Sequence, residues 1–340
     1  MHVITGHPHA AAPQLIDRFG RRITYVRLSV TDRCDFRCVY CMSEAMEFLP
    51  RACILTLEEL AQLGQTFVAL GVHKIRLTGG EPLVRKDVLW LCQQLGQLPG
   101  LRELALTTNG SQLERFAKPL RAAGVRRLNI SLDTLHPDRF QRITRAGELR
   151  KVLCGLQAAQ SAGFERIKLN AVILKNRNHD EVVDLVRFAV NEGLDISFIE
   201  EMPLGAIGDH DRAEAYYASD QIRADLVERF TLVATPENTG GPSRYYRIPG
   251  ADTRIGFISP HSHNFCGDCN RVRVTAEGRL LLCLGQEHSV DLRRVLRAYP
   301  GDQLRLQQTV RDAMASKPKA HDFNFQTQPV GLRYMNLTGG

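Results

Sequence analysis

The sequence predicts an α/β fold: an open, partial (β/α)6 barrel of the TIM type, with a C-terminal α+β extension that closes the barrel. From residue 23 to 202, short β-branched runs alternate with longer helical runs, as in parallel strands joined by helical crossovers. Distinctive polar or cysteine-rich segments follow five of the strand runs. Strand ends that meet on one face are typical of barrel enzymes, whereas a doubly wound sheet concentrates its site at one switch point.

The first two hundred residues contain six strand and five helix candidates. The strands are predicted at residues 24–30, 74–77, 103–107, 127–130, 166–172 and 196–199, and the helices at residues 56–70, 87–95, 113–123, 149–162 and 179–192. Thr56 and Glu59 have the spacing of a capping box at the first helix. Glycines follow four of the helices, at Gly71, Gly124, Gly163 and Gly193, where they favour helix termination.

The pattern changes after Pro203, and we expect a domain boundary between residues 205 and 240. We therefore divide the chain into residues 1–205, a partial barrel, and residues 206–340, a C-terminal region. Ser219 is expected to cap a helix at residues 219–230. Short antiparallel strands are predicted at 244–248, 254–259, 271–275 and 280–284, and helices at 290–297 and 303–315. The tail from residue 321 has no clear period.

Composition places the chain among ordinary globular proteins. It has 340 residues, 44% of them hydrophobic, and a formal charge of +7. The basic residues are dispersed, which argues against a nucleic-acid arm and is compatible with an anionic small substrate. No stretch approaches the roughly 18 apolar residues of a membrane span. Nine cysteines without a signal-peptide pattern predict a reducing compartment, the cytoplasm.

Cys34, Cys38 and Cys41 form a C-x3-C-x2-C array directly after the first predicted strand. Three thiols are one short of a closed zinc site. Three thiolates on one loop can hold three corners of a [4Fe–4S] cluster and leave the fourth iron open. With Tyr40 before the last cysteine, the array resembles that of the radical S-adenosylmethionine (radical SAM) enzymes. The alternatives are a zinc knuckle or three unrelated thiols.

A second trio of thiols lies more than 200 residues away, at Cys266, Cys269 and Cys283. One zinc ion shared by the two trios is the simplest alternative, but six thiolates overfill a tetrahedral site and three underfill it. The remaining cysteines are Cys53, Cys92 and Cys154. The last two fall within helical patterns, where a free buried cysteine is ordinary core.

The cysteine array, the TGGEPL segment at 78–83 and the FCGDCNRVRVTAEGRLLLCL segment at 265–284 together resemble the GTP 3′,8-cyclase family of molybdenum cofactor biosynthesis. The resemblance covers essentially the whole chain. It implies a lyase that converts GTP to (8S)-3′,8-cyclo-7,8-dihydroguanosine 5′-triphosphate through a 5′-deoxyadenosyl radical, an early step of molybdopterin synthesis. It also implies two [4Fe–4S] clusters, one held by each cysteine trio, and S-adenosylmethionine (SAM) bound at the first.

The resemblance assigns further residues to the two small molecules. The SAM site would comprise Tyr40, Gly80, Ser131 and Met202, with Gly80 allowing the backbone to approach the ligand. The GTP site would comprise Arg27, Arg76, Thr107, Lys168, Arg271, Val272 and Arg273. Buried cations within strands require a charged partner or ligand, and guanidinium groups suit phosphate oxygens. The terminal Gly339 and Gly340 would fold into the site, although Thr338 stands where an aliphatic residue is expected.

The resemblance further implies a one-electron donor protein and the next enzyme of molybdopterin synthesis as partners, with a homodimer as one compatible assembly, and neither a membrane nor a nucleic acid. A second hypothesis is a radical SAM enzyme with an auxiliary cluster that acts on a peptide. Such enzymes usually carry more than three C-terminal cysteines. A third is a basic zinc-binding nucleic-acid module, which the dispersed charge and 7% aromatic content disfavour.

Overall fold

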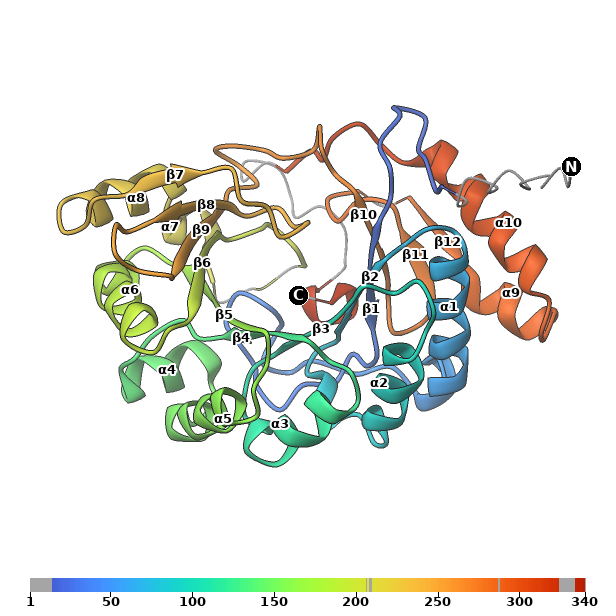
Figure 1. The fold of residues 1–340 in the computed structure, drawn as a ribbon, viewed down its shortest axis with the longest axis horizontal. Coiled ribbons are helices and arrows are strands. Elements are labelled where there is room, and N and C mark those ends of the chain that lie inside the picture. The colour runs from blue at the N-terminus through green and yellow to red at the C-terminus, as the bar shows by residue number, and fades with distance from the viewer. Residues whose placement is uncertain (1–13, 206, 208–209, 287, 324–333, 340) are drawn as a thin grey trace, which may run out of the picture.

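The computed structural model describes residues 14–205, 207, 210–286, 288–323 and 334–339. Six parallel strands pair in sequence order and curve around a central space, with helices on the outside (Figure 1). The strands are β1 (Tyr25–Ser29), β2 (Lys74–Thr78), β3 (Glu103–Thr108), β4 (Arg127–Ser131), β5 (Arg166–Ile173) and β6 (Asp195–Glu200). The predicted open barrel is confirmed, and each predicted strand is present within one or two residues.

The outer helices are α1 (Leu57–Ala69), α2 (Val88–Gly96), α3 (Leu113–Ala122), α4 (Pro137–Thr144), α5 (Leu149–Ser161) and α6 (Val182–Asn191). The capping box of α1 is formed as predicted, because the Thr56 hydroxyl accepts from the Glu59 amide and the Glu59 carboxylate accepts from the Thr56 amide. Helix α4 was not predicted. It is short and mostly polar, and it buries chiefly Phe140 and Ile143, too few apolar positions to give a period.

The C-terminal region adds strands to both edges of the same sheet. It contains α7 (Arg212–Ala215), α8 (Ser219–Val227), β7 (Val233–Thr235), β8 (Arg244–Arg247), β9 (Arg254–Ile258), β10 (Arg271–Val274), β11 (Arg279–Leu281), β12 (Ser289–Asp291), α9 (Leu292–Ala298), α10 (Gln303–Ala313) and α11 (Met335–Thr338). The twelve-stranded order is β12-β11-β10-β1-β2-β3-β4-β5-β6-β9-β8-β7. The sheet is thus continuous across residue 205, and the division of the chain there stays a prediction.

The prediction that the C-terminal strands are antiparallel is only half right. β8 and β9 pair antiparallel, as do β10 and β11, but β9 lies parallel to β6 and β10 parallel to β1. A parallel pairing needs a long crossover, and long connections separate β6 from β9 and β1 from β10. Short-range sequence patterns therefore could not identify these two partners.

One local prediction is wrong, and the start of one predicted helix is shifted by two residues. Ser219 is the first residue of α8 and not its cap, because its hydroxyl accepts from the Ser259 hydroxyl at 2.7 Å and Ala218 occupies the N-cap position. Residues 290 and 291 belong to β12, and α9 starts only at Leu292, capped by the Asp291 carboxylate. In both places a tertiary contact overrides the local preference.

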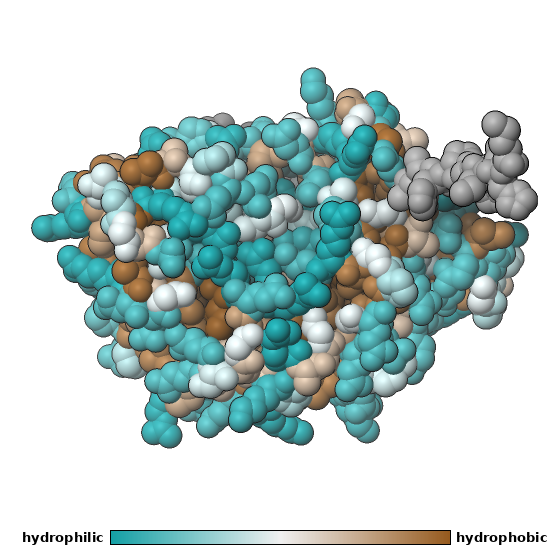
Figure 2. Space-filling model, in the orientation of Figure 1, coloured by the Kyte–Doolittle hydropathy of each residue, from teal (hydrophilic) through white to brown (hydrophobic). Residues whose placement is uncertain are grey.

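One continuous apolar core lies between the sheet and its helices. Strand residues alternate in direction, so that Val26 and Leu28 of β1 belong to this core while Tyr25 and Arg27 line the central space. Hydrophilic side chains gather around the middle of the face drawn in Figure 2, with hydrophobic side chains visible between the elements. Among the described residues, no helix combines the length and apolar character needed to cross a membrane.

Candidate active site

A cavity inside the ring of parallel strands is lined by both cysteine trios. The predicted site residues that line it are Arg27, Cys34, Cys38, Tyr40, Cys41, Arg76, Gly80, Thr107, Ser131, Lys168, Met202, Cys266, Cys269, Arg271, Val272, Arg273 and Cys283. Gly339 lies beside the cavity, where its carbonyl oxygen accepts from Arg273 Nη1 at 2.5 Å. Gly340 lies outside the described residues. The fold therefore brings together residues as far apart in the sequence as Arg27 and Gly339.

The first trio lies on the loop that follows β1. Backbone contacts shape this loop: the Cys41 amide donates to the Cys38 carbonyl, and the Phe36 amide donates to Cys34 Sγ at 3.3 Å. Burial raises the pKa values of Cys34, Cys38 and Cys41, the last to about 12. A bound metal would reverse this effect by taking the thiolate form. This donor set suits iron–sulfur ligation.

The second trio lies toward the other end of the parallel strands: Cys266 and Cys269 precede β10, which runs parallel to β1, and Cys283 follows β11. Burial raises the pKa values of Cys266 and Cys283. Burial acts in the same direction on Cys269, but the charges of Arg271 and Lys317 outweigh it and lower the Cys269 pKa. Among the described residues, no three His, Cys, Asp or Glu side chains converge on a point where a single ion would bind. Thiolates around a cubic cluster each bind a different iron.

The glycine turn after β2 packs directly against the first cysteine loop. The Gly80 amide donates to the Thr31 carbonyl at 2.8 Å, and the Glu81 amide donates to the Arg33 carbonyl at 2.8 Å. A Cβ at position 80 would lie 2.4 Å from the Arg33 carbonyl oxygen. Glycine is therefore required for contact with the loop backbone, a reason that the sequence did not reveal.

Glu81 stabilises the same turn through hydrogen bonds. Its carboxylate accepts from the Leu83 and Asn109 amides and from the Thr108 hydroxyl, at 3.0, 2.6 and 2.8 Å. It is fully buried. Glu81 was not predicted as a site residue, although its place in the TGGEP segment was a usable signal.

Tyr40 is oriented by an acid that the sequence analysis did not assign to the site. The Tyr40 hydroxyl donates to Asp133 Oδ2 at 2.7 Å, and the Val172 amide donates to Asp133 Oδ1 at 2.9 Å. Burial raises the pKa of Asp133 to about 6. Asp133 thus connects the cysteine loop to strands β4 and β5, and its position just after a strand was the only sequence signal.

Cations gather between the two trios. The strand register places Arg27 beside Arg76 on one side and beside Arg273 on the other. Burial, together with neighbouring cations, lowers the pKa of Arg27 and brings that of Arg273 to about 10. Lys168 on β5 is also buried, and burial lowers its pKa. These cations are mutually repulsive and would be stabilised by an anion.

Polar groups near these cations add to the demand for a ligand. Within the described part of the chain, Arg76 Nε, Thr107 Oγ1 and Asn129 Nδ2 are buried without a hydrogen-bond partner. Buried polar groups are normally paired, and unpaired ones at a cavity indicate that a ligand or water completes them. The site therefore fits a polar, strongly anionic small molecule.

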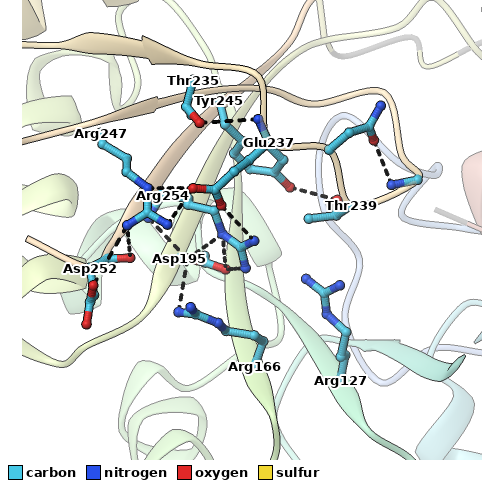
Figure 3. Close-up of polar contacts among 12 residues, drawn as sticks. Arg127, Arg166, Asp195, Thr235, Glu237, Thr239, Tyr245, Arg247, Asp252 and Arg254 are labelled. Carbon is cyan, nitrogen blue, oxygen red and sulfur yellow. Dashed lines mark hydrogen bonds and ion pairs between the residues drawn. The ribbon is translucent and has the colours of Figure 1, made fainter.

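A segment at residues 237–243 forms a further wall of the cavity and was not predicted. Lys74 Nζ donates to the Thr239 carbonyl at 2.6 Å, and the Tyr245 and Thr239 hydroxyls lie 3.0 Å apart. Figure 3 shows how the start of this segment is held: Glu237 accepts from Arg247 and from Arg254, and Arg254 also pairs with buried Asp195 at 2.6 Å. This network fixes the wall to the edge of the barrel.

The open parallel barrel, the cysteine loop after its first strand and the glycine turn after its second define the class of radical SAM proteins. Residues 28–189 match the Radical SAM superfamily, and residues 194–323 match Molybdenum Cofactor Synthesis C. The fold is similar to that of Streptococcus suis SuiB bound to S-adenosylmethionine, with a TM-score of 0.59 and 13% identity over 86% of this chain and 69% of that chain. For the structure of SuiB bound to precursor peptide SuiA, the TM-score is 0.60 with 13% identity, over 94% of this chain and 77% of that chain.

Curated relatives narrow the class. The chain is 62% identical over 327 residues to the GTP 3′,8-cyclase of Pseudomonas entomophila (strain L48). The alignment covers 96% of this chain and 98% of that protein. It is 60% identical over 329 residues to the GTP 3′,8-cyclase of Pseudomonas syringae pv. syringae (strain B728a), over 96% and 99%. The chain belongs to the GTP 3′,8-cyclase family. It is a radical SAM enzyme whose cofactors are SAM and [4Fe–4S] clusters, and the peptide-directed alternative is not favoured.

Proposed function

We propose that this chain converts GTP to (8S)-3′,8-cyclo-7,8-dihydroguanosine 5′-triphosphate in molybdenum cofactor biosynthesis. The observation that carries the proposal is one cavity lined by two separate cysteine trios with buried cations between them. The names of the relatives support GTP as the substrate. Neither a zinc site nor a nucleic-acid surface accounts for this arrangement.

In this proposal Cys34, Cys38 and Cys41 hold the first cluster. Bound there, the cluster and SAM would supply radical chemistry of the 5′-deoxyadenosyl type, directed at C3′ of GTP. The chain binds and orients SAM through Tyr40, Gly80, Ser131 and Met202. Tyr40 is suited to this role because Asp133 fixes its hydroxyl.

The cationic residues of β1, β2, β5 and β10 bind the triphosphate. Arg27, Arg76 and Arg273 lie on adjacent strands in register, so their guanidinium groups can surround phosphate oxygens. Thr107, Lys168, Arg271 and Val272 complete the GTP site. The buried strand positions keep water away from the reacting atoms, which strengthens each charged contact.

Cys266, Cys269 and Cys283 hold the second cluster. The Gly339 and Gly340 tail completes the site. The contacts of α11 support this role of the tail, because α11 packs against the first cysteine loop. The Met335 amide donates to the Cys41 carbonyl at 3.3 Å, and Asn336 Nδ2 donates to the Asp32 carbonyl at 2.9 Å. Gly339 has φ near +75°, and a Cβ there would meet Thr78 Oγ1.

The proposal also includes a one-electron donor protein and the next enzyme of molybdopterin synthesis as partners. A homodimer is compatible with it. We place the enzyme in the cytoplasm, because none of the nine cysteines, all of which are described, forms a disulfide.

Anaerobic reconstitution followed by turnover tests the proposed function. The wild-type chain should bind about eight irons with labile sulfide, and Cys283→Ala about four. With GTP, SAM and a reductant, the wild-type chain should release 5′-deoxyadenosine and a cyclised nucleotide, which mass analysis identifies. ATP in place of GTP should not yield this product. Fewer than about seven irons, zinc in place of iron, or no 5′-deoxyadenosine with GTP would contradict the proposal.

A further inference from the structure

Lys317 is a buried lysine at the second cysteine trio. It is 1% exposed and follows the short turn Met314–Ser316 after α10. Its Nζ donates to the Leu282 carbonyl at 2.6 Å, to the Arg271 carbonyl at 3.1 Å and to Cys269 Sγ at 3.6 Å. The ammonium has three N–H donors, so these contacts use its full capacity.

No carboxylate of the described residues balances the charge of Lys317. Among the ion pairs of the described residues, none includes Lys317, and its two carbonyl partners are neutral. Burying an ammonium without an anion is costly. Of the three groups that accept from Lys317, only the Cys269 sulfur can carry a negative charge.

Arg21 fixes the backbone that follows this lysine. Arg21 Nη1 donates to the Cys266 carbonyl at 2.7 Å and to the Lys319 carbonyl at 2.8 Å, and Nη2 donates to the Pro318 carbonyl at 2.6 Å. Arg21 is itself held by Asp17 at 2.6 Å. One guanidinium thus joins the cysteine loop to the segment that carries Lys317.

The first trio differs in its direct hydrogen-bond donors, although the charge of Arg212, which pairs with Glu201 at 3.1 Å, also acts on Cys41. The described hydrogen bonds to its sulfurs come from neutral groups, such as the Phe36 amide and Asn109 Nδ2, at 3.3 and 3.8 Å from Cys34 Sγ. A cluster held by three thiolates carries a net negative charge, and its reduction adds another. Hydrogen bonds to the sulfurs and nearby positive charge therefore favour the reduced form.

We propose that Lys317 is a positioning residue of the second cluster, whose ammonium balances the Cys269 thiolate and raises the reduction potential of that cluster above the value it would otherwise have. The proposal rests on the proposed function, because that function assigns Cys266, Cys269 and Cys283 as ligands. It assigns to a residue outside the cysteine motifs the task of making the two clusters electronically different.

The test uses the full-length chain with Cys34→Ala, Cys38→Ala and Cys41→Ala, so that all bound iron belongs to the second trio. Lys317→Met removes the charge and the donor, Lys317→Arg keeps the charge, and Lys319→Met removes an exposed lysine two residues away as the matched control. After anaerobic reconstitution, iron content is measured and the cluster is titrated potentiometrically with detection by electron paramagnetic resonance.

At the midpoint potential of the parent, we expect Lys317→Met to lower the ratio of reduced to oxidised cluster about tenfold, which equals about 59 mV for one electron. Lys317→Arg should fall between Lys317→Met and the parent, and Lys319→Met should match the parent. A Lys317→Met midpoint equal to that of Lys319→Met, at full iron content, overturns the inference.

Loss of iron is also informative, provided that far-ultraviolet circular dichroism shows a folded chain. If Lys317→Met loses iron and Lys317→Arg retains it, charge balance by Lys317 is supported. If both variants lose iron equally, shape rather than charge decides, and the proposal fails. If the parent itself binds fewer than about three irons, the assignment of the second trio fails, which is a failure of the proposed function and not of the role of Lys317.

Discussion

Replacing Gly80 by alanine tests the contact between the glycine turn after β2 and the first cysteine loop. The added Cβ would lie 2.4 Å from the Arg33 carbonyl oxygen, 2.6 Å from the Arg33 carbonyl carbon and 2.7 Å from the Asp32 carbonyl oxygen. All three atoms are backbone, so no side chain can rotate away. The cysteine loop and the turn must separate by about 0.6 to 1 Å to restore ordinary contact.

This displacement acts on the segment proposed to hold the first cluster and SAM. A misplacement of about 1 Å at a reacting centre costs roughly 100-fold in rate. We therefore expect Gly80→Ala to lower 5′-deoxyadenosine formation about 100-fold and to weaken SAM binding. Iron at the second trio should stay in place, because Cys266, Cys269 and Cys283 stand on other segments, before β10 and after β11.

The assay compares Gly80→Ala with Gly267→Ala after anaerobic reconstitution. Gly267 lies within the second cysteine motif, and a Cβ there meets nothing within 4 Å. SAM affinity is measured by equilibrium dialysis, turnover by 5′-deoxyadenosine release and folding by thermal unfolding. If Gly80→Ala binds SAM and turns over within threefold of Gly267→Ala, the steric reasoning is wrong.

Three further predictions concern buried charges and thiols. Lys168→Met should stabilise the ligand-free protein by about 1 kcal/mol, because it removes a buried cation. The same variant should bind GTP about 2 kcal/mol more weakly, or roughly 30-fold, as measured by calorimetry. Because burial lowers the Lys168 pKa, the unfolded chain binds more protons just below pH 10.5, so wild-type stability should rise with pH in that window. The rise should be smaller in Lys168→Met, where Lys74 and Tyr25, whose pKa values are also lowered in the folded chain, still contribute. Asp195→Asn should cost about 3 kcal/mol in urea unfolding, because Arg254 loses its buried partner; a loss below about 1 kcal/mol would show that Glu237 suffices. Iodoacetamide should modify half-buried Cys53 in the native chain but not Cys92, which is fully buried with its pKa raised to about 12; equal labelling by mass spectrometry would refute this.

Local sequence rules accounted for most of the barrel. The Thr56 and Glu59 spacing predicted a cap that is present, and alternation of strand and helix runs located all six parallel strands. The same rules failed where a distant contact decides the structure. Ser219 turns its hydroxyl to Ser259, 40 residues away, and so does not act as the cap.

The candidate site divides in the same way. Its cysteines stand in tight local motifs, and its buried cations interrupt apolar strands, so both could be recognised in the sequence. Asp133, Lys317 and the segment 237–243 have no such motif. They became visible only as neighbours of Tyr40, of Cys269 and of Tyr245.

The sequence by itself determined the alternating α/β class, the two thiol trios and the chemistry that three thiolates on a loop permit, because these depend on residue type and short spacing. Only the tertiary structure decided that β9 pairs with β6 and that β10 pairs with β1, the pairing that brings the two trios to one cavity. The tertiary structure also decided the partner of each buried charge, such as Asp195 for Arg254 and the Cys269 sulfur for Lys317. These strand pairings join residues 246 positions apart (Tyr25 and Arg271) and 59 positions apart (Ile196 and Ile255); they depend on the packing of the whole sheet, and no local propensity encodes that.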